Sequence, residues 1–382
     1  MIAAHKTDMP KTGPPAQVTG VIPYHVMNAA RDIRFVTAPD GTQLATARYG
    51  AGPPLIKAAT WLTHIDRVEP GSIHDAVISE FAQRHTYVEY DTRGCGLSQR
   101  RVDDISVEAW VGDLEAVADA HGREPFTLLA FTCAVGVAVE YAARHPERVR
   151  NLILFGGFAT SYHSTSHPDP TVRREGDLML ELAALGWGSS SPAFRQVFVS
   201  RFLPDATPAQ WKAFDELQRA TATPDVAVRQ LRAMYSMNVK EAAARVRCPA
   251  LVLHPKGDEM VRFEQGRRLA SLIPGARFVP LPGRNHIPFP QEPAWAEFVR
   301  ETREFLGAAA APAPGRSVQL TARQAEVLRH IAFGESDKQI AKVLGLSPRT
   351  VEMHAARTLA ALGCRTRAEA VRLATGRRLL GT

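Results

Sequence analysis

Four side chains carry the groups on which a chemical interpretation of this 382-residue sequence depends. They are the hydroxyl of Thr132, the thiol of Cys133, the carboxylate of Asp258 and the imidazole of His286. A hydroxyl or thiol that acts with an imidazole and a carboxylate can transfer acyl groups, and the same groups can hold the polar part of a ligand. Which of the two they do depends on the elements that position them.

A second set of reactive groups is basic and lies near the C-terminus. Residues 319–382 contain eleven Lys and Arg against five Asp and Glu, whereas the other 318 residues contain 35 against 34. A small basic module beside a nearly neutral large one indicates a polyanionic partner, most often nucleic acid. The alternative is a basic face that is only solvated.

The four cysteines, at 95, 133, 248 and 364, are too few and too scattered for a disulfide framework or a C-x-x-C zinc site. We therefore expect reduced thiols, no metal and no cofactor. The N-terminus MIAAHKTDMPKTGPPAQ lacks the apolar core of a secretory signal, and no run of about 18 apolar residues is present to span a bilayer. These features predict a soluble, cytoplasmic protein with no membrane partner.

The chain is long enough for two domains, and its 45% hydrophobic and 22% charged residues are typical of globular proteins. The Ala- and Pro-rich segment GAAAAPAPGR, residues 307–316, predicts a short semi-rigid linker. It separates a large domain, residues 31–306, from a small one, residues 317–382. Residues 1–30 are polar and Pro-rich and are interpreted as a loosely held N-terminal arm.

Eight short apolar runs in the large domain predict strands. Helical patterns, such as residues 106–122 and 135–149, lie between several of them, which favours an α/β fold with a mostly parallel sheet covered on both faces. The segment from about 160 to 245 lacks strand runs and predicts a helical cap over the sheet. The predicted strand runs are IRFVTAP, TQLATARYG, PLIKAAT, YVEYD, FTLLAF, NLILFGG, ALVLHP and ARFVPLP.

Four motifs in order give the large domain a resemblance to the α/β-hydrolases. Residues 91–98 match D-x-R-G-x-G-x-S, and residues 128–149 resemble the strand, nucleophile elbow and helix of that family. Residues 251–258 resemble the strand that ends in the triad acid, and residues 283–286 resemble the loop with the triad histidine. The resemblance implies an α/β-hydrolase-like sheet with a helical cap, and it places Thr132, Asp258 and His286 at the triad positions.

The elbow departs from the family pattern, because Ala130-Phe-Thr-Cys-Ala134 replaces G-x-S-x-G. The turn needs a strained backbone, usually with positive φ, which costs a β-branched threonine more than a serine. Cys133 stands one position late, where the family uses a backbone N–H as oxyanion donor, so we expect a buried filler there. The second donor position falls on Trp61, where Ala-Thr precedes it instead of His-Gly.

Three interpretations of the large domain follow. We favour a degenerate hydrolase that senses a small, mainly apolar ligand through Trp61, Thr132, Cys133 and His286. The alternative is an active esterase-type hydrolase with Thr132, Asp258 and His286 as its triad. A third is a shell used only for dimerisation, in which the polar pair merely holds two loops together. Aromatic residues of the insertion are expected mainly in the core, with some lining a ligand cavity: Trp187, Phe194, Phe198, Phe202, Trp211 and Phe214.

Four short helices are predicted in the small domain, which is therefore all-α. Thr321 with Gln324 forms a capping box, Ser336 or Asp337 caps a second helix that Gly345 ends, and Ser347-Pro348 begins a third. Thr366 caps the fourth. The tight turn LGLS, residues 344–347, makes the second and third helices a helix-turn-helix.

Residues 320–354 match throughout the pattern of the DNA-binding domain of LuxR-type regulators, which the small domain strongly resembles. The resemblance implies a recognition helix over about 347–362 that enters operator DNA, and a homodimer on two half-sites. Glu352 and Met353 are the candidates for reading base edges, and Lys338 for clamping the backbone. The predicted DNA-binding residues are Lys338, Arg349, Thr350, Glu352, Met353, His354 and Arg357. The whole sequence predicts a transcription regulator with double-stranded operator DNA and a small-molecule effector as partners.

Overall fold

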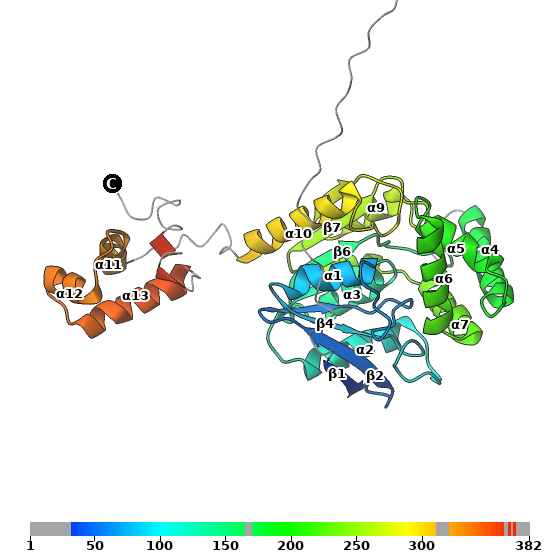
Figure 1. Ribbon diagram of the computed structural model, residues 1–382, viewed down its shortest axis with the longest axis horizontal. Coiled ribbons are helices and arrows are strands. Elements are labelled where there is room, and N and C mark those ends of the chain that lie inside the picture. The colour runs from blue at the N-terminus through cyan, green and yellow to red at the C-terminus, as the bar shows by residue number, and fades with distance from the viewer. Residues whose placement is uncertain (1–31, 165–169, 311–320, 363–365, 368–369, 372–382) are drawn as a thin grey trace, which may run out of the picture.

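The structure is a computed structural model that describes residues 32–164, 170–310, 321–362, 366–367 and 370–371 (Figure 1). The predicted N-terminal arm, most of the predicted linker and Cys364 lie outside the described residues. Among the described residues, no helix combines the length and apolar character needed to cross a membrane.

Eight strands form one sheet in the order β1-β2-β4-β3-β5-β6-β7-β8. β2 pairs antiparallel with β1 and with β4, and the remaining neighbours are parallel. Each of the eight predicted runs forms a strand, and the mostly parallel sheet is confirmed. The strands are β1 (Asp32–Thr37), β2 (Gln43–Tyr49), β3 (Pro54–Lys57), β4 (Thr86–Tyr90), β5 (Phe126–Phe131), β6 (Val149–Phe155), β7 (Ala250–Pro255) and β8 (Arg277–Leu281).

Helices cover both faces of the sheet because successive strand residues alternate between two apolar clusters. Leu128 and Leu152 join the cluster that contains residues of four helices together with residues of the cap described below, whereas Leu129 and Ile153 join the cluster that contains residues of two helices. The first group is α2 (Val107–Ala120), α3 (Ala134–Arg144), α8 (Lys240–Arg245) and α9 (Phe263–Leu272), and the second is α1 (Ile73–Ala82) and α10 (Pro293–Ala310). Both strand faces are therefore buried, as the near-continuous apolar runs predict.

Four of the helices between β6 and β7 form the cap and lie together at one side of the sheet in Figure 1. They are α4 (Pro170–Gly186), α5 (Ala193–Phe202), α6 (Pro208–Thr221) and α7 (Pro224–Tyr235). Arg195 is fully buried among them and donates to the carbonyl oxygens of Gly186, Trp187 and Ser189, while it pairs with Asp215. This buried cation braces the cap internally, and the sequence pattern gave no sign of it.

The small domain contains α11 (Ala322–Ala332), α12 (Asp337–Leu344) and α13 (Pro348–Leu362). Thr321 and Ser336 cap the first two with full capping boxes, and Gly345 ends α12 in the left-handed conformation with φ of 64°. Val327, Ile340 and Val351 are fully buried in a small apolar cluster. The first three predicted helices and their caps are thereby confirmed.

Two predicted segments, the linker and the fourth helix of the small domain, are only partly described by the structure. Helix α10 continues to Ala310, so the first residues of the predicted linker 307–316 are helical, consistent with the high helix propensity of alanine. Of the predicted fourth helix of the small domain, Arg367, Ala370 and Val371 are helical, and the Ala370 N–H donates to the Thr366 carbonyl oxygen at 3.1 Å. The rest of that helix lies outside the described residues.

Candidate functional site

Thr132 stands at the sharp turn between β5 and α3, where only it and Cys133 separate strand from helix. Its φ is 52°, and within the described ranges it is the one non-glycine residue with positive φ. Its N–H donates to the Phe155 carbonyl oxygen of β6 at 2.8 Å, which ties the turn to the sheet. A β-branched residue in this region is strained by about 1–3 kcal/mol. The elbow geometry is thus retained although the residue disfavours it.

The Thr132 hydroxyl does not engage the imidazole. It donates to Cys133 Sγ with an O···S distance of 3.5 Å, whereas His286 Nε2 is buried without a hydrogen-bond partner in the part of the chain that the structure describes. A base activates a hydroxyl when it is hydrogen-bonded to that hydroxyl and can accept its proton. The arrangement therefore leaves the hydroxyl without activation.

Asp258 and His286, in contrast, form a complete pair. Asp258 Oδ2 accepts from His286 Nδ1 at 2.6 Å, and both side chains are fully buried. Asp258 Oδ1 accepts from the backbone N–H groups of Met260 and Val261 at 2.9 Å each. The Nδ1 atom is therefore the ring nitrogen that engages the carboxylate, and Nε2 is the one turned away from it.

A second imidazole, His254 on β7, lies against the same carboxylate. Its Nε2 is 3.3 Å from Asp258 Oδ2 and 2.8 Å from the Val261 carbonyl oxygen, and the ring is fully buried. Burial alone raises the pKa of Asp258, but His286 and His254 beside it hold that pKa well below its ordinary value. His254 was not among the residues predicted for the site. Its position on a buried strand, four residues before Asp258, was the available signal.

The Cys133 thiol is buried beside the turn and lines the same space as Trp61. Burial raises the pKa of the thiol, while the Thr132 hydroxyl and the neighbouring N–H groups of Trp61, Cys133 and Ala134 act against that rise. The thiol therefore stays protonated, which makes it a weak nucleophile.

One cavity of about 330 Å³ brings together the four residues predicted to bind a ligand. Trp61, Thr132, Cys133 and His286 all line it, whereas Asp258 lies behind the imidazole. Of the insertion aromatics, Phe202 lines the cavity, and Trp187 packs against Trp61 with 5.1 Å between ring centroids and an interplanar angle of 32°. The volume lies within the range of small-molecule sites, about 300–1,000 Å³. Lining residues that the sequence did not single out include Phe158, Thr160, Tyr162, Arg201, Met234, Tyr235 and Met260.

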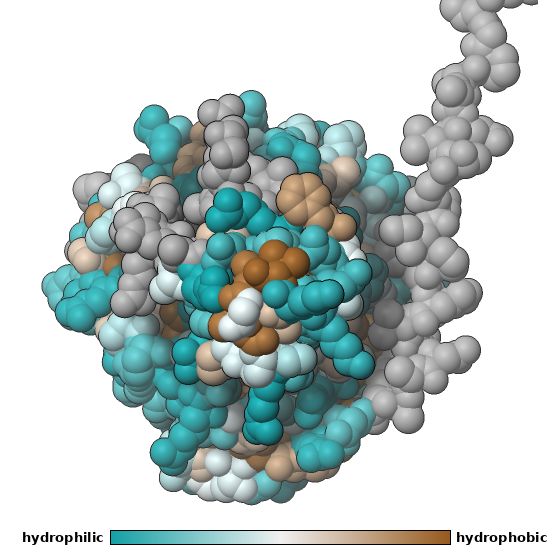
Figure 2. Space-filling model, turned by 90° about the vertical axis from the view of Figure 1, so that its left-hand side faces the viewer, coloured by the Kyte–Doolittle hydropathy of each residue, from teal (hydrophilic) through white to brown (hydrophobic). Residues whose placement is uncertain are grey.

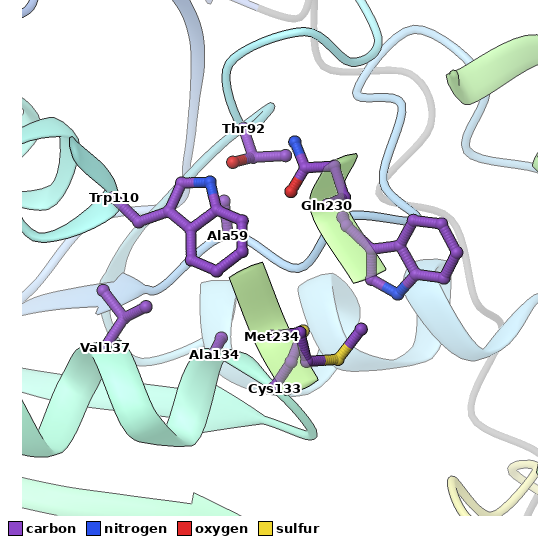
Figure 3. A pocket seen from close by; sticks show the side chains of 9 residues that line it. Ala59, Thr92, Trp110, Cys133, Ala134, Val137, Gln230 and Met234 are labelled. Carbon is purple, nitrogen blue, oxygen red and sulfur yellow. The ribbon is translucent and has the colours of Figure 1, made fainter. Parts of the chain in front are cut away.

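A second void beside the elbow is much smaller, about 10 Å³ (Figure 3). Trp61, Cys133 and Met234 line both spaces. The Trp110 indole N–H and the Gln230 side-chain carbonyl line the small void without a partner in the described structure. A void of this size accommodates about one water molecule. The large cavity is therefore the candidate site for an organic ligand.

Neither space offers a metal site of ordinary composition. Among the described residues, no group of three or more His, Cys, Asp or Glu side chains is arranged to hold a metal ion.

The seven residues predicted to contact DNA all lie on α12 and α13. Lys338, Arg349, Glu352, Met353 and Arg357 are exposed, whereas Thr350 and His354 are half-buried. The recognition helix begins at Pro348, and the Ser347 hydroxyl accepts from the Thr350 N–H at 3.1 Å. The Thr350 hydroxyl also bonds to the Ser347 hydroxyl at 2.8 Å, so it takes part in the cap.

The buried side of α13 and an ion pair at the start of α12 hold these two helices in place. Ala355 and Thr358 are buried on α13, and Thr358 donates to the His354 carbonyl oxygen at 2.8 Å. Arg367 donates to both carboxylate oxygens of Asp337, at 2.6 and 2.8 Å, and thereby braces the start of α12. Neither Thr358 nor the ion pair was predicted, because a threonine on a helix and two distant charges give no sequence signal of contact.

The exposed surface of the small domain carries large apolar side chains as well as charged ones. Phe333, Val343 and Met353 are large apolar side chains that remain exposed, by 82%, 62% and 39%. Figure 2 views the molecule from the side on which this domain lies in Figure 1 and shows small hydrophobic areas within a largely hydrophilic surface. An exposed methionine on the recognition helix suits apolar contact with a thymine methyl group.

Comparison with known proteins gives matches to both parts of the chain. Residues 70–293, more than half of the chain, match the alpha/beta hydrolase fold model, and residues 318–374 match bacterial regulatory proteins, luxR family. A 2-hydroxy-6-oxo-2,4-heptadienoate hydrolase from Pseudomonas putida is 25% identical over 285 residues, which cover 68% of this chain and 87% of that protein. A pimeloyl-[acyl-carrier protein] methyl ester esterase from Nitrosomonas europaea is 23% identical, covering 63% and 91%.

Solved structures show the same fold. The enol-lactonase from Burkholderia xenovorans LB400 superposes with a TM-score of 0.59 at 19% identity and covers 72% of this chain and 100% of its own. A hydrolase from Pseudomonas aeruginosa gives a TM-score of 0.60 at 21% identity, covering 73% and 100%. The chain belongs to the alpha/beta hydrolase fold family and carries, at its C-terminal side, a DNA-binding domain of the luxR family of bacterial regulatory proteins.

Proposed function

We propose that this protein is a transcription regulator whose hydrolase-fold domain binds a small, mainly apolar effector and does not hydrolyse it. One observation carries the proposal. The Thr132 hydroxyl is bonded to Cys133 Sγ while His286 Nε2 has no partner in the described structure, so nucleophile and base are not joined. A pocket that keeps its buried Asp258–His286 pair but has lost that link is suited to binding.

The composition of the cavity supports a mainly apolar effector. Phe158, Phe202, Met234 and Met260 contribute apolar surface to its walls. A few polar groups among apolar walls are what orient a ligand in typical small-molecule sites. Trp61 connects the cavity to the cap through Trp187, so effector binding near Trp61 favours one cap position over another.

The small domain supports action on operator DNA as a homodimer. Helix-turn-helix domains place the second helix in the major groove, and two-fold dimers read two half-sites. Effector binding would then shift the balance between arrangements that do and do not present the two recognition helices correctly.

Operator affinity with and without effector tests the proposal. Duplexes selected by the full-length protein from a random library serve as the operator, and a panel of amphipathic compounds serves as candidate effectors. A compound that stabilises the protein against heat is expected to change operator affinity by at least about 5-fold. Identical binding curves for all stabilising compounds would reject the sensing role.

Two variants distinguish contacts with the DNA backbone from contacts with the bases. Lys338→Ala is expected to weaken binding to all duplexes and to reduce the salt slope by about 1, because it removes a backbone contact. Glu352→Ala is expected to relax sequence preference at one position by about 1–3 kcal/mol. Equal losses on every duplex for both variants would contradict the assignment of Glu352.

The alternative function is an esterase-type hydrolase, favoured by the intact Asp258–His286 pair and by relatives named as hydrolases and esterases. Hydrolysis of p-nitrophenyl butyrate by the full chain, compared with Thr132→Ala, discriminates the two. Turnover that this substitution abolishes, with ligand binding retained, would establish the enzyme. Equal rates for both proteins support the sensor.

A further inference from the structure

Three charged side chains line the large cavity where it opens to solvent. Glu175 of α4 and Arg201 of α5 belong to the cap, whereas Arg262 directly precedes α9 of the sheet domain. Their side chains are 27%, 21% and 71% exposed, whereas His286 in the same lining is fully buried. These three residues therefore form the mouth cluster of the cavity.

The mouth cluster holds more positive than negative charge. Glu175 serves both arginines, because its Oε1 lies 2.7 Å from Arg201 Nη2 and its Oε2 lies 3.5 Å from Arg262 Nη2. Glu264, the other carboxylate of the lining, has a cation of its own in Arg267 at 2.5 Å. One carboxylate thus faces two guanidinium groups, which leaves one positive charge at the mouth.

Arg201 also has donors that no protein group uses. Its Nη2 makes all of its contacts with acceptors of the described structure: Glu175, the Glu259 carbonyl oxygen at 3.0 Å and the Tyr162 hydroxyl at 3.4 Å. Nε and Nη1 have no acceptor among the described residues, and neither atom is enclosed by protein. The Glu259 carboxylate is engaged by Arg284 at 2.8 Å. A guanidinium is always charged, and its N–H groups match the two oxygens of a carboxylate.

Behind the mouth cluster the cavity has mainly apolar walls. Phe158, Phe202, Met234 and Met260 line it, and each of them is buried. A charged opening that leads to apolar walls suits a ligand with one charged end and an apolar body. The sign of the unbalanced charge requires that end to be an anion.

From this distribution of charge, and resting on the proposed sensing role, we infer that the effector is an amphipathic, singly charged carboxylate. Its carboxylate binds the Nε and Nη1 donors of Arg201 beside Arg262, which brings the mouth cluster to zero net charge. Its apolar body packs against Phe158 and Phe202 inside the cavity. Glu175 competes for the same arginines and therefore limits the affinity for the effector.

Three probes of one shape and different charge test the inference by calorimetric titration of the full chain at neutral pH. 4-Butylbenzoate is an anion, 4-butylbenzamide is neutral, and 4-butylbenzamidine is a cation. We expect the benzoate to bind at least about 10-fold more tightly than the benzamide, because charge-assisted hydrogen bonds are stronger than neutral ones. The benzamidine is expected to bind most weakly, because it meets the unbalanced positive charge.

Substitutions in the mouth cluster are expected to change the affinity in opposite directions. Arg201→Gln and Arg262→Gln each remove a positive charge and should weaken benzoate binding by about 10-fold and about 3-fold, with benzamide binding unchanged. Glu175→Gln removes the competing carboxylate and should strengthen benzoate binding by about 3–10-fold, which damage to the fold does not produce. Arg268→Gln is the matched control, because Arg268 is exposed on α9 outside the cavity lining and its loss changes the net charge equally.

The failures of this inference and of the sensing role are distinguishable. Equal affinity for benzoate and benzamide, no binding of the benzoate, weaker benzoate binding by Glu175→Gln, or equal effects of Arg262→Gln and Arg268→Gln would each overturn the inference. The sensing role survives these results if another compound changes operator affinity. If the benzoate binds with the expected selectivity but no bound compound changes operator affinity, the carboxylate site stands and the sensing role is wrong.

Discussion

The two halves of the cavity site differ in how completely they retain the hydrolase arrangement. The acid–base half keeps a buried Asp258–His286 pair whose carboxylate also receives two backbone N–H groups. The nucleophile half keeps the strained backbone at Thr132, but its hydroxyl is directed at Cys133 Sγ and not at His286. The contacts that also hold the fold together are therefore complete, whereas the Thr132 hydroxyl and the imidazole, whose alignment only catalysis requires, are not hydrogen-bonded to each other.

The largest expected effect tests whether the acid–base half is structural. Asp258→Asn replaces a buried carboxylate that accepts three hydrogen bonds and lies 3.3 Å from His254 Nε2, and we expect a loss of about 3 kcal/mol of unfolding free energy in urea. Glu259→Gln is the control, because its pair with Arg284 is about half exposed and contributes less than about 1 kcal/mol. Equal, small losses for both variants would show that the pair is not needed for the fold.

The pH dependence of that loss follows from the pKa of Asp258. The folded protein holds this pKa below the ordinary value of 3.8, so the carboxylate stabilises the fold at every pH above that value. The stabilisation disappears as pH falls through the folded-state pKa. The difference between parent and Asp258→Asn is therefore expected to shrink as pH falls below about 4. A difference that grows in acid contradicts the assignment.

A smaller effect tests what positions the imidazole. Gly156 has φ of 60°, and an added Cβ would lie 3.0 Å from His286 Cε1. Gly275 has φ of 70° with nothing within 4 Å of an added Cβ, so it is the matched control. We expect Gly275→Ala to cost about 1 kcal/mol from backbone strain alone and Gly156→Ala to cost about 2 kcal/mol, with a shifted His286 imidazole resonance. Equal costs and an unmoved resonance would show that the close approach is unimportant.

The sequence predicted much of this arrangement because its signals are local. Apolar runs and turn residues placed every strand, and capping residues such as Thr321 and Gly345 placed the helices of the small domain. The elbow motif likewise indicated the positive φ at Thr132. Each of these features is determined by residues next to each other in the chain.

Contacts between distant segments were not predictable in the same way. The rotamer that turns the Thr132 hydroxyl toward sulfur, the approach of His254 to Asp258, and the packing of Trp187 against Trp61 depend on tertiary packing. Cap residues that line the cavity come from helices whose apolar pattern is that of any core. The sequence therefore indicated four residues that line the cavity, and the structure supplied the other lining residues and the hydrogen bonds.

A third, smaller effect tests the strain in the nucleophile half. Thr132→Gly removes the Cβ that disfavours φ of 52°, and we expect a gain of about 0.5–1 kcal/mol after the greater backbone freedom of glycine in the unfolded chain is subtracted. Ala130→Gly, two residues earlier on β5, is expected to lose about 0.5–1 kcal/mol because no strain is relieved there. Urea denaturation measures both. A lower unfolding free energy for both variants than for the parent would mean that the elbow is not strained.

The last test concerns catalysis. Thr132→Ser restores the usual nucleophile of the fold, yet we expect hydrolysis of p-nitrophenyl butyrate no faster than by Thr132→Ala. The reason is that the Thr132 hydroxyl bonds to Cys133 Sγ and not to His286 Nε2, and a serine hydroxyl in the same place is expected to make the same contact. Adding Cys133→Gly to the serine variant removes this acceptor and is expected to raise the rate at least about 10-fold. If the serine alone restores turnover, its hydroxyl reaches the imidazole once the methyl group is absent, and the contact with sulfur does not prevent activation.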